Sequence, residues 1–139
     1  MRLKKSTEAA IRTLMHLAKH EGKSNNNLMA KSLKVPRNHL HKIVQELSRG
    51  GYLKTSPGKG GGVTLVKPAG RITLYEVVNL MEGPIYLTDC ILDHKMCYLS
   101  KGCTLRPKIE EVQEQMLNIF KSSTIQDLIN GENRKEASK

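Results

Sequence analysis

Apolar residues recur with helical spacing over residues 36–49, the most regular stretch of the chain. The recurring positions are Leu40, Ile43, Val44 and Leu47. Positions i, i+3, i+4 and i+7 lie on one side of an α-helix, so the stretch predicts a helix with one buried stripe. Pro36 presets a helical φ at its start, and Gly50 and Gly51 can close it in the left-handed conformation. The opposite, polar side holds Arg37, Asn38, His39, Lys42, Gln45 and Arg49.

Two short runs with strand character follow this helix, at residues 52–55 and 63–66. The turn-forming sequence SPGKGGG joins them and predicts a hairpin. A P-loop is the alternative for the glycine run. That alternative is weak because the Lys-Ser/Thr pair of a P-loop is missing and the run leads into a strand.

Two shorter helices are expected before this unit. Ser6 or Thr7 can cap the first, which Gly22 ends, and the asparagines at 25–27 can cap the second, over 28–33. Three helices and a hairpin follow the order of winged helix-turn-helix domains, in which the third helix enters the DNA major groove near its N-terminal end. We therefore expect the following residues to contact DNA: Arg37, Asn38, His39 and Lys42 on the helix, and Lys59 and Gly60 on the wing. A merely solvated basic face is the plainer alternative.

The second half of the chain predicts three more features. Thr73 and Glu76 match a capping box that starts a helix ending at Gly83. Residues 85–103 show no sustained periodicity. A long helix then begins at Leu105, and Thr124 starts a short final one. The long helix has apolar residues at heptad spacing: Leu105, Ile109, Val112, Met116 and Ile119. This stripe suits either a dimer partner or the chain's own domain.

The expected fold is therefore mainly α with a small β wing, a winged helix-turn-helix domain plus a long dimerisation helix. We divide the chain into the DNA-binding domain with its following helix over 1–83, a cysteine loop over 84–104, the dimerisation and terminal helices over 105–130, and a disordered polar tail over 131–139.

Charge is distributed unevenly along the 139 residues. The net charge is +10, yet residues 1–70 hold 14 Lys or Arg against 3 acidic residues, whereas residues 71–139 hold 9 against 10. A polyanion is the simplest partner for such a basic half, because neutralised phosphates release counterions. A membrane surface is the alternative, but no strongly apolar face lies opposite the basic residues. With no signal segment or membrane span in the sequence, we expect a cytoplasmic protein.

The three cysteines, Cys90, Cys97 and Cys103, lie in one loop with the spacing C-x6-C-x5-C. Clustered thiols in a cytoplasmic chain indicate metal or redox chemistry, and thiolates are soft ligands for iron–sulfur clusters or zinc. Zinc sites prefer tight two-residue pairs, which are missing here, so an iron–sulfur cluster is favoured. Three unligated buried thiols are the remaining alternative. Asp89, Asp93 and His94 are local candidates for a fourth ligand, and none stands out.

The helix sequence VPRNHLHKIVQEL, the wing ending GGVTLVKP and the three cysteines before a long helix resemble the Rrf-type winged-helix regulators over about residues 1–130. The resemblance implies a homodimeric transcription factor in which the three cysteines bind one iron–sulfur cluster per subunit. In the NsrR-like branch, an acidic residue of the partner subunit at the start of the first helix completes the site, and Glu8 occupies that position here. An acid there also suits the helix dipole alone.

Two positions depart from the family pattern. Arg106 stands where the IscR-like branch has a histidine three residues after the last cysteine, which favours the NsrR-like branch. Pro57 stands where many members carry a minor-groove arginine before the first glycine of the wing, which leaves Lys59 as the substitute.

The sequence thus predicts a cluster-dependent repressor, not an enzyme, that binds a palindromic operator and senses nitric oxide or redox or iron status. A 4Fe–4S cluster is favoured and 2Fe–2S stays open. The rivals are a zinc-stabilised DNA-binding protein without sensing and a small electron carrier, and the basic first half speaks against the carrier.

Overall fold

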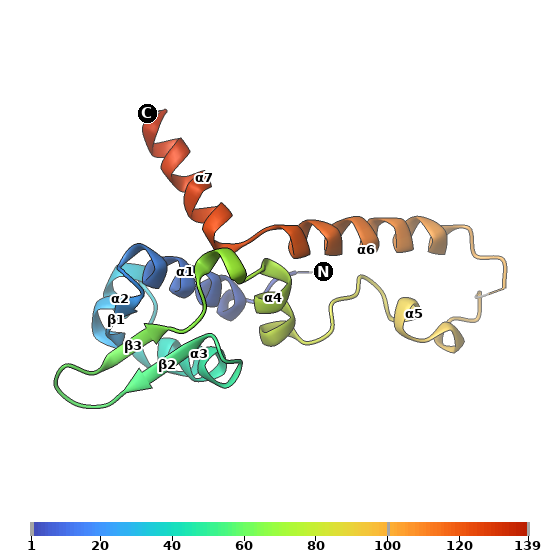
Figure 1. Ribbon diagram of the computed structural model, residues 1–139. Helices are drawn as coiled ribbons and strands as arrows, with labels where there is room; N and C mark the ends of the chain where they lie inside the picture. The colour runs from blue at the N-terminus through green and yellow to red at the C-terminus, as the bar shows by residue number, and fades with distance from the viewer. Residues whose placement is uncertain (1, 100, 139) are drawn as a thin grey trace.

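The computed structural model describes residues 2–99 and 101–138 and is mainly helical with one small sheet (Figure 1). The elements in chain order are α1 (Lys5–Lys19), β1 (Lys23–Ser24), α2 (Asn26–Leu33), α3 (Arg37–Arg49), β2 (Leu53–Ser56), β3 (Gly62–Leu65), the 3-10 turn η1 (Ala69–Arg71), α4 (Leu74–Glu82), α5 (Asp89–Leu92), the 3-10 turn η2 (His94–Met96), α6 (Leu105–Ser122) and α7 (Ile125–Ala137).

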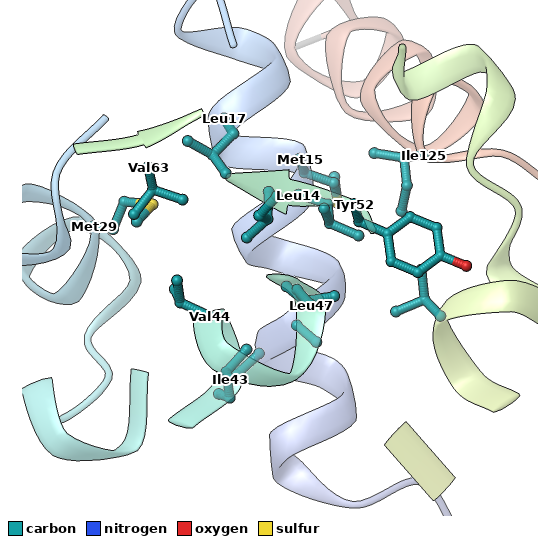
Figure 2. Packing of buried hydrophobic residues seen from close by; sticks show 14 of the residues in the cluster. Leu14, Met15, Leu17, Met29, Ile43, Val44, Leu47, Tyr52, Val63 and Ile125 are labelled. Atoms are coloured by element: carbon teal, nitrogen blue, oxygen red, sulfur yellow. The ribbon is translucent and has the colours of Figure 1, made fainter. Parts of the chain in front are cut away.

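The core forms around α1, which packs against α2, α3, α4 and α7. Its side chains are mostly aliphatic, as the scarcity of aromatic residues requires, with Tyr52 packed among them, and Figure 2 shows several of them together. The fully buried side chains include Leu14 and Leu17 from α1, Met29 from α2, Val63 from β3 and Ile125 from α7. The predicted stripe of α3 is confirmed, because Leu40, Ile43, Val44 and Leu47 are all buried. Gly51, at φ +84°, closes α3 with Tyr52 N–H donating to Leu47 O over 3.0 Å.

The wing is a three-stranded antiparallel sheet in the order β1-β3-β2. The hairpin of β2 and β3 was predicted, and Leu53 pairs with Leu65 in it. The strand β1 was not expected. It pairs Lys23 with Thr64 and covers the other edge of β3, so the wing is joined to the segment between α1 and α2.

The start of α1 differs from the prediction that Ser6 or Thr7 caps it. The helix begins at Lys5, and its N-cap residue Lys4 makes no side-chain cap. Thr7 is instead completely buried and donates to Glu82 at the far end of α4, which also accepts from Lys4 N–H over 2.7 Å. A carboxylate distant in sequence thus satisfies the first turn of α1.

The next connection also differs in detail. Glu21, at φ +59°, takes the left-handed position at the end of α1, and Gly22 N–H donates to Leu17 O over 2.7 Å. The asparagine cap of α2 is confirmed, because Asn25 Oδ1 accepts from Leu28 N–H over 2.8 Å. Leu28, counted among the apolar members of this helix, is 59% exposed.

Beyond the wing, the predicted capping box at Thr73 is present, and the predicted helix start at Thr124 forms a second one. Thr73 and Glu76 start α4, and Thr124 and Asp127 start α7. The two helix starts lie together, since Leu74 N–H donates to Ser123 O and Ile125 N–H to Ile72 O. From there α6 extends away from the α1–α3 body, with α5 beside its distant end (Figure 1).

The C-terminal segment is more ordered than expected. Residues 131–137, assigned to a disordered tail, continue α7 as far as Ala137. Their sequence, GENRKEA, contains good helix formers and no proline, and Lys19 pairs with Glu132. Over residues 2–99 and 101–138, no helix is both long and apolar enough to span a bilayer.

Candidate nucleic-acid interface and cysteine loop

The predicted DNA-contacting residues of α3 are all exposed at the N-terminal end of the helix. None of the four belongs to the buried stripe of the helix, and the side chains of Arg37, Asn38, His39 and Lys42 are all exposed. Successive residues are about 100° apart around a helix, so Asn38, Lys42, Gln45 and Arg49 form one polar stripe opposite the core. His39 lies on the flank of that stripe. Lys42 and Arg49 therefore lie on one surface, and Arg37 lies on the flank opposite His39.

Close packing within the protein itself requires glycine at two positions of the wing. A Cβ at Gly61 would lie 2.2 Å from Ser56 O, and one at Gly62 would lie 2.6 Å from Ser24 O, so the close approach of strand and turn requires glycine at both positions. Lys59 and Gly60 are exposed at the tip. Lys23 Nζ donates to Gly60 O over 3.0 Å and holds the tip against the β1 segment.

The base of the wing is joined to α4 through Glu76. This carboxylate accepts from Thr73 N–H over 2.8 Å and from Lys67 Nζ over 2.9 Å. Partial burial acts to raise the pKa of Glu76, but the hydrogen bonds from Thr73 and Lys67 outweigh it and lower the pKa. The Lys67 ammonium also lies 5.4 Å from the centre of the Tyr52 ring. Wing and α4 are thereby coupled at one point.

The cysteine loop has little core of its own. Cys90, Cys97 and Cys103 are half-buried free thiols, and Cys90 Sγ lies 3.0 Å from Thr88 Oγ1. The neighbouring large apolar side chains are exposed: Leu92, Met96, Tyr98 and Leu99, with Tyr98 at 94%. The loop is attached to α6 mainly by Gln113, which donates to Ile85 O over 2.6 Å and accepts from Leu87 N–H over 2.8 Å.

The structure does not bring the predicted metal ligands together. Across the described ranges 2–99 and 101–138, no three His, Cys, Asp or Glu side chains are grouped closely enough to hold a metal ion. The chemistry of the donors nevertheless fits an iron–sulfur group, since the loop carries three soft thiols. Sequence spacing places thiols in one loop but does not fix the distances between them.

Two of the local candidates for a fourth ligand, His94 and Asp93, have other partners. Arg106 Nη2 donates to His94 Nε2 over 3.0 Å, and Asp93 Oδ1 accepts from Lys95 N–H over 2.9 Å. Asp89 lies in the first turn of α5 and is exposed. Glu8 is exposed in the first turn of α1, beside a shallow basic pocket lined by Arg2, Lys4 and Lys5. The element that carries the first cysteine, α5, packs against η2 and α6.

Three functional or positioning residues were missed by the sequence prediction: Glu82, Gln113 and Asn26. Glu82 acts on residues more than seventy positions away, and Gln113 on backbone atoms 28 and 26 positions away. Such contacts leave no local pattern in a sequence. Asn26 is the first residue of α2, and only the structure shows the pocket that it lines.

The apolar stripe of the long helix is covered by the chain's own domain on one edge only. One edge packs on α4, and Gln113 on that side is 8% exposed. The other edge is open, with Leu105 at 65%, Val112 at 54% and Ile119 at 62% exposure. These three residues are seven positions apart, so they form a continuous apolar edge along α6.

Taken together, the helix order, the three-stranded wing and the basic exposed end of α3 define a winged helix-turn-helix DNA-binding regulator. A profile of the Rrf2 family, described as iron-dependent transcriptional regulators, matches residues 3–131. The chain belongs to this family.

Comparison with individual proteins agrees with that assignment. The HTH-type transcriptional regulator NsrR of Geobacillus kaustophilus is 34% identical over 132 residues, which cover 93% of this chain and 90% of that protein. The fold is similar to that of CymR, the global cysteine regulator of B. subtilis, with a TM-score of 0.78 at 20% identity over 94% of this chain and 97% of the other. It also resembles T. potens IscR, with a TM-score of 0.74 at 16% identity over 95% and 88%. The names are those of regulators, which points to a protein that is not an enzyme.

Proposed function

We propose that this protein is a homodimeric, iron–sulfur cluster-dependent repressor that acts in the cytoplasm and responds to nitric oxide or to redox or iron status. The observation that supports it most is the location of Cys90, Cys97 and Cys103. They are half-buried thiols on a loop without its own core, in a chain whose other half is a basic DNA-binding domain. The similarity to the NsrR of G. kaustophilus points in the same direction.

The three cysteines would hold the cluster, and Glu8 of the partner subunit is the candidate for the fourth ligand. When bound, the cluster would supply a redox-active centre that nitric oxide and oxidants can attack. The protein chain itself would transmit the state of the cluster to the rest of the molecule by mechanical contacts. Gln113 connects the start of the loop to α6, and the open apolar edge of α6 is the surface for a second subunit.

Ordering of the loop would therefore influence the pairing of the two α6 helices. That pairing sets the separation of the two α3 helices, which must match half-sites about 34 Å apart on DNA. Loss of the cluster would free the loop and populate dimers with a different separation, which bind the operator less well.

Anaerobic purification tests the cofactor. We expect brown protein with visible absorption, and we expect Cys97→Ser to lose most of that colour while keeping its helix content by circular dichroism. Met96→Ser, in the same loop and exposed, is the matched control and should stay coloured. Colourless wild-type protein with stoichiometric zinc would instead identify the zinc-stabilised alternative.

A companion experiment tests the α3 surface. The double change Arg37→Ala and Lys42→Ala should weaken binding to a palindromic duplex and reduce the slope of log K against log salt by about two, since each phosphate contact accounts for roughly one. Lys108→Ala with Lys135→Ala removes the same charge from α6 and α7 and should keep the wild-type slope. Equal slopes for the two double variants would contradict contact through α3.

The coupling between cluster binding and DNA binding is tested on one duplex, which the cluster-loaded protein selects from a random pool. The affinities of the cluster-loaded and metal-free proteins for this duplex are then compared. We expect the loaded protein to bind at least tenfold more tightly, a difference typical of allosteric coupling. If both forms bind every duplex equally well, the protein is not a cluster-dependent switch.

A further inference from the structure

A second polar site lies beside the predicted DNA-contacting surface. It is a pocket of about 350 Å³ between the start of α2, the C-terminal half of α3 and strand β2 of the wing. Its polar lining residues are Asn26, His41, Gln45, Ser48, Arg49 and Thr55. The pocket is thus enclosed by three elements that surround the DNA-binding surface of a winged helix domain.

Two buried polar atoms in this pocket lack a partner. Of the side chains in residues 2–99 and 101–138, Asn26 Oδ1 and Ser48 Oγ are buried without any hydrogen bond. Buried polar atoms are nearly always paired, because an unpaired one keeps the full cost of its dehydration. The two residues that carry these atoms line the same pocket, although they come from different helices. This coincidence indicates a ligand that pairs with both.

The pocket opens where DNA would lie. Gln45 and Arg49 line it and also belong to the polar stripe of α3 that contains Asn38 and Lys42. Thr55 belongs to the wing strand that pairs with β3. A duplex whose major groove receives α3 therefore passes its backbone across the space between that helix and the wing.

We propose that this pocket binds a phosphodiester group of the DNA backbone, with Ser48 and Asn26 as hydrogen-bond donors and Arg49 as the nearby cation. The inference rests on the DNA-binding role of α3. Ser48 Oγ can rotate its proton toward a phosphate oxygen, and a half-turn of the Asn26 amide puts Nδ2 in the place of Oδ1. Arg49 is paired with Glu46 over 2.9 Å, but the pair is exposed and weak, so the guanidinium can turn to a phosphate.

Such a contact would position the protein on the duplex without selecting bases. Phosphate contacts fix the register and orientation of a DNA-binding domain, whereas base edges provide specificity. Loss of the contact should therefore weaken binding to operator and unrelated duplexes by the same factor. A contact from α3 to a base would change the ratio between them.

The decisive comparison is Asn26→Asp against Asn27→Asp. Both changes add one negative charge to the first turn of α2, where it suits the helix dipole, and the melting temperature of each variant checks that it folds. Only residue 26 lines the pocket, while residue 27 is exposed beside it. We expect Asn26→Asp to weaken DNA binding at least tenfold more than Asn27→Asp does, because a carboxylate in the pocket repels the phosphate.

A neutral pair of variants removes long-range charge effects. Ser48→Ala should weaken binding to every duplex about tenfold or more, the usual effect of one lost hydrogen bond to a charged group. Ser32→Ala, an exposed serine of α2 outside this pocket, should leave affinity unchanged. Ethylation of one DNA phosphate at a time should identify a phosphate whose modification blocks DNA binding by the wild-type protein. Ethylation of the same phosphate should not affect DNA binding by Ser48→Ala.

Two results would overturn the assignment. They are equal losses for Asn26→Asp and Asn27→Asp, or unchanged affinity for Ser48→Ala with only a shift in melting temperature, as for a pocket that holds water. Wild-type protein that binds no duplex would instead refute the DNA-binding role itself. Normal wild-type binding with pocket variants that behave like their controls refutes the pocket alone.

Discussion

Individual side chains show how the environment, more than residue type, determines the effect of a change. Leu14 on α1 is completely buried in the aliphatic core, while Leu28 on α2 is 59% exposed, although both belong to predicted apolar helix faces. Burial of a leucine side chain contributes several times more to stability than a surface contact, because the cavity left by its loss adds to the lost transfer free energy.

We expect Leu14→Ala to lower the free energy of unfolding by about 2–5 kcal/mol. Leu28→Ala is the matched control and should change it by no more than about 0.5 kcal/mol, as most surface changes do. Urea unfolding followed by circular dichroism measures both values. Similar losses at the two positions would mean that the packing around α1 is not as described.

Another single residue makes stability depend on pH. Partial burial lowers the pKa of His16, and the neighbouring His20 and Lys19 lower it further. The unfolded chain therefore takes up a proton near pH 6.5, before the folded protein does, so stability is retained above this pH and falls as the pH drops below it.

His16→Gln should flatten the dependence of melting temperature on pH between about 7 and 5. His39→Gln, on the exposed flank of α3, should keep the wild-type profile. A profile for His16→Gln as steep as that of the wild type would assign the acid sensitivity to other groups.

At the scale of elements, helix ends differ in how they are satisfied. The N-cap residue of α4 is Thr73, whose hydroxyl accepts from Glu76 N–H over 3.2 Å. The N-cap residue of α6 is Thr104, which makes no side-chain cap. The same residue type thus occupies the same position of two helices with and without the stabilising bond.

Thr73→Ala should therefore cost about 1 kcal/mol of stability, the usual value of a lost cap, while Thr104→Ala should cost close to nothing. The free energy of unfolding from denaturant titration decides between them. Should Thr104→Ala cost as much as Thr73→Ala, the capping bond is not the source of the stability.

Elements also divide into those that the sequence could predict and those that it could not. The stripe of Leu40, Ile43, Val44 and Leu47 and the boxes at Thr73 and Thr124 are local patterns, so α3, α4 and α7 were recognised. The two-residue strand β1 has no pattern of its own and forms because the edge of β3 needs a partner. The pocket of Asn26 and Ser48 depends on how α2 meets α3, which spacing does not encode.

The whole molecule consists of a DNA-binding body and an extension made of α6 and the cysteine loop. The extension leaves an apolar edge of α6 open, and exposed apolar edges of this kind mark association surfaces. The basic charge lies almost wholly in the body, while the extension is nearly neutral. The neutral part can therefore pair with a second copy without strong repulsion.

Val112→Glu should convert the proposed dimer into a monomer and reduce operator binding by more than tenfold, because a charge would be buried in the apolar edge. Asn118→Glu adds the same charge on another side of α6 and should leave the dimer intact. Sedimentation equilibrium and DNA titration follow the two effects. A dimeric Val112→Glu protein would place the subunit interface elsewhere.

The backbone bridge between Thr73 and Thr124 has a further meaning for evolution. The chain leaves this bridge at the start of α4 and returns to it after the end of α6. The segment between the two threonines is therefore connected to the rest of the fold in the way that an insertion is. The entropy of closing a flexible loop grows only slowly with its length. Lineages of this fold can therefore gain or lose residues between the second and third cysteine without rebuilding the DNA-binding domain.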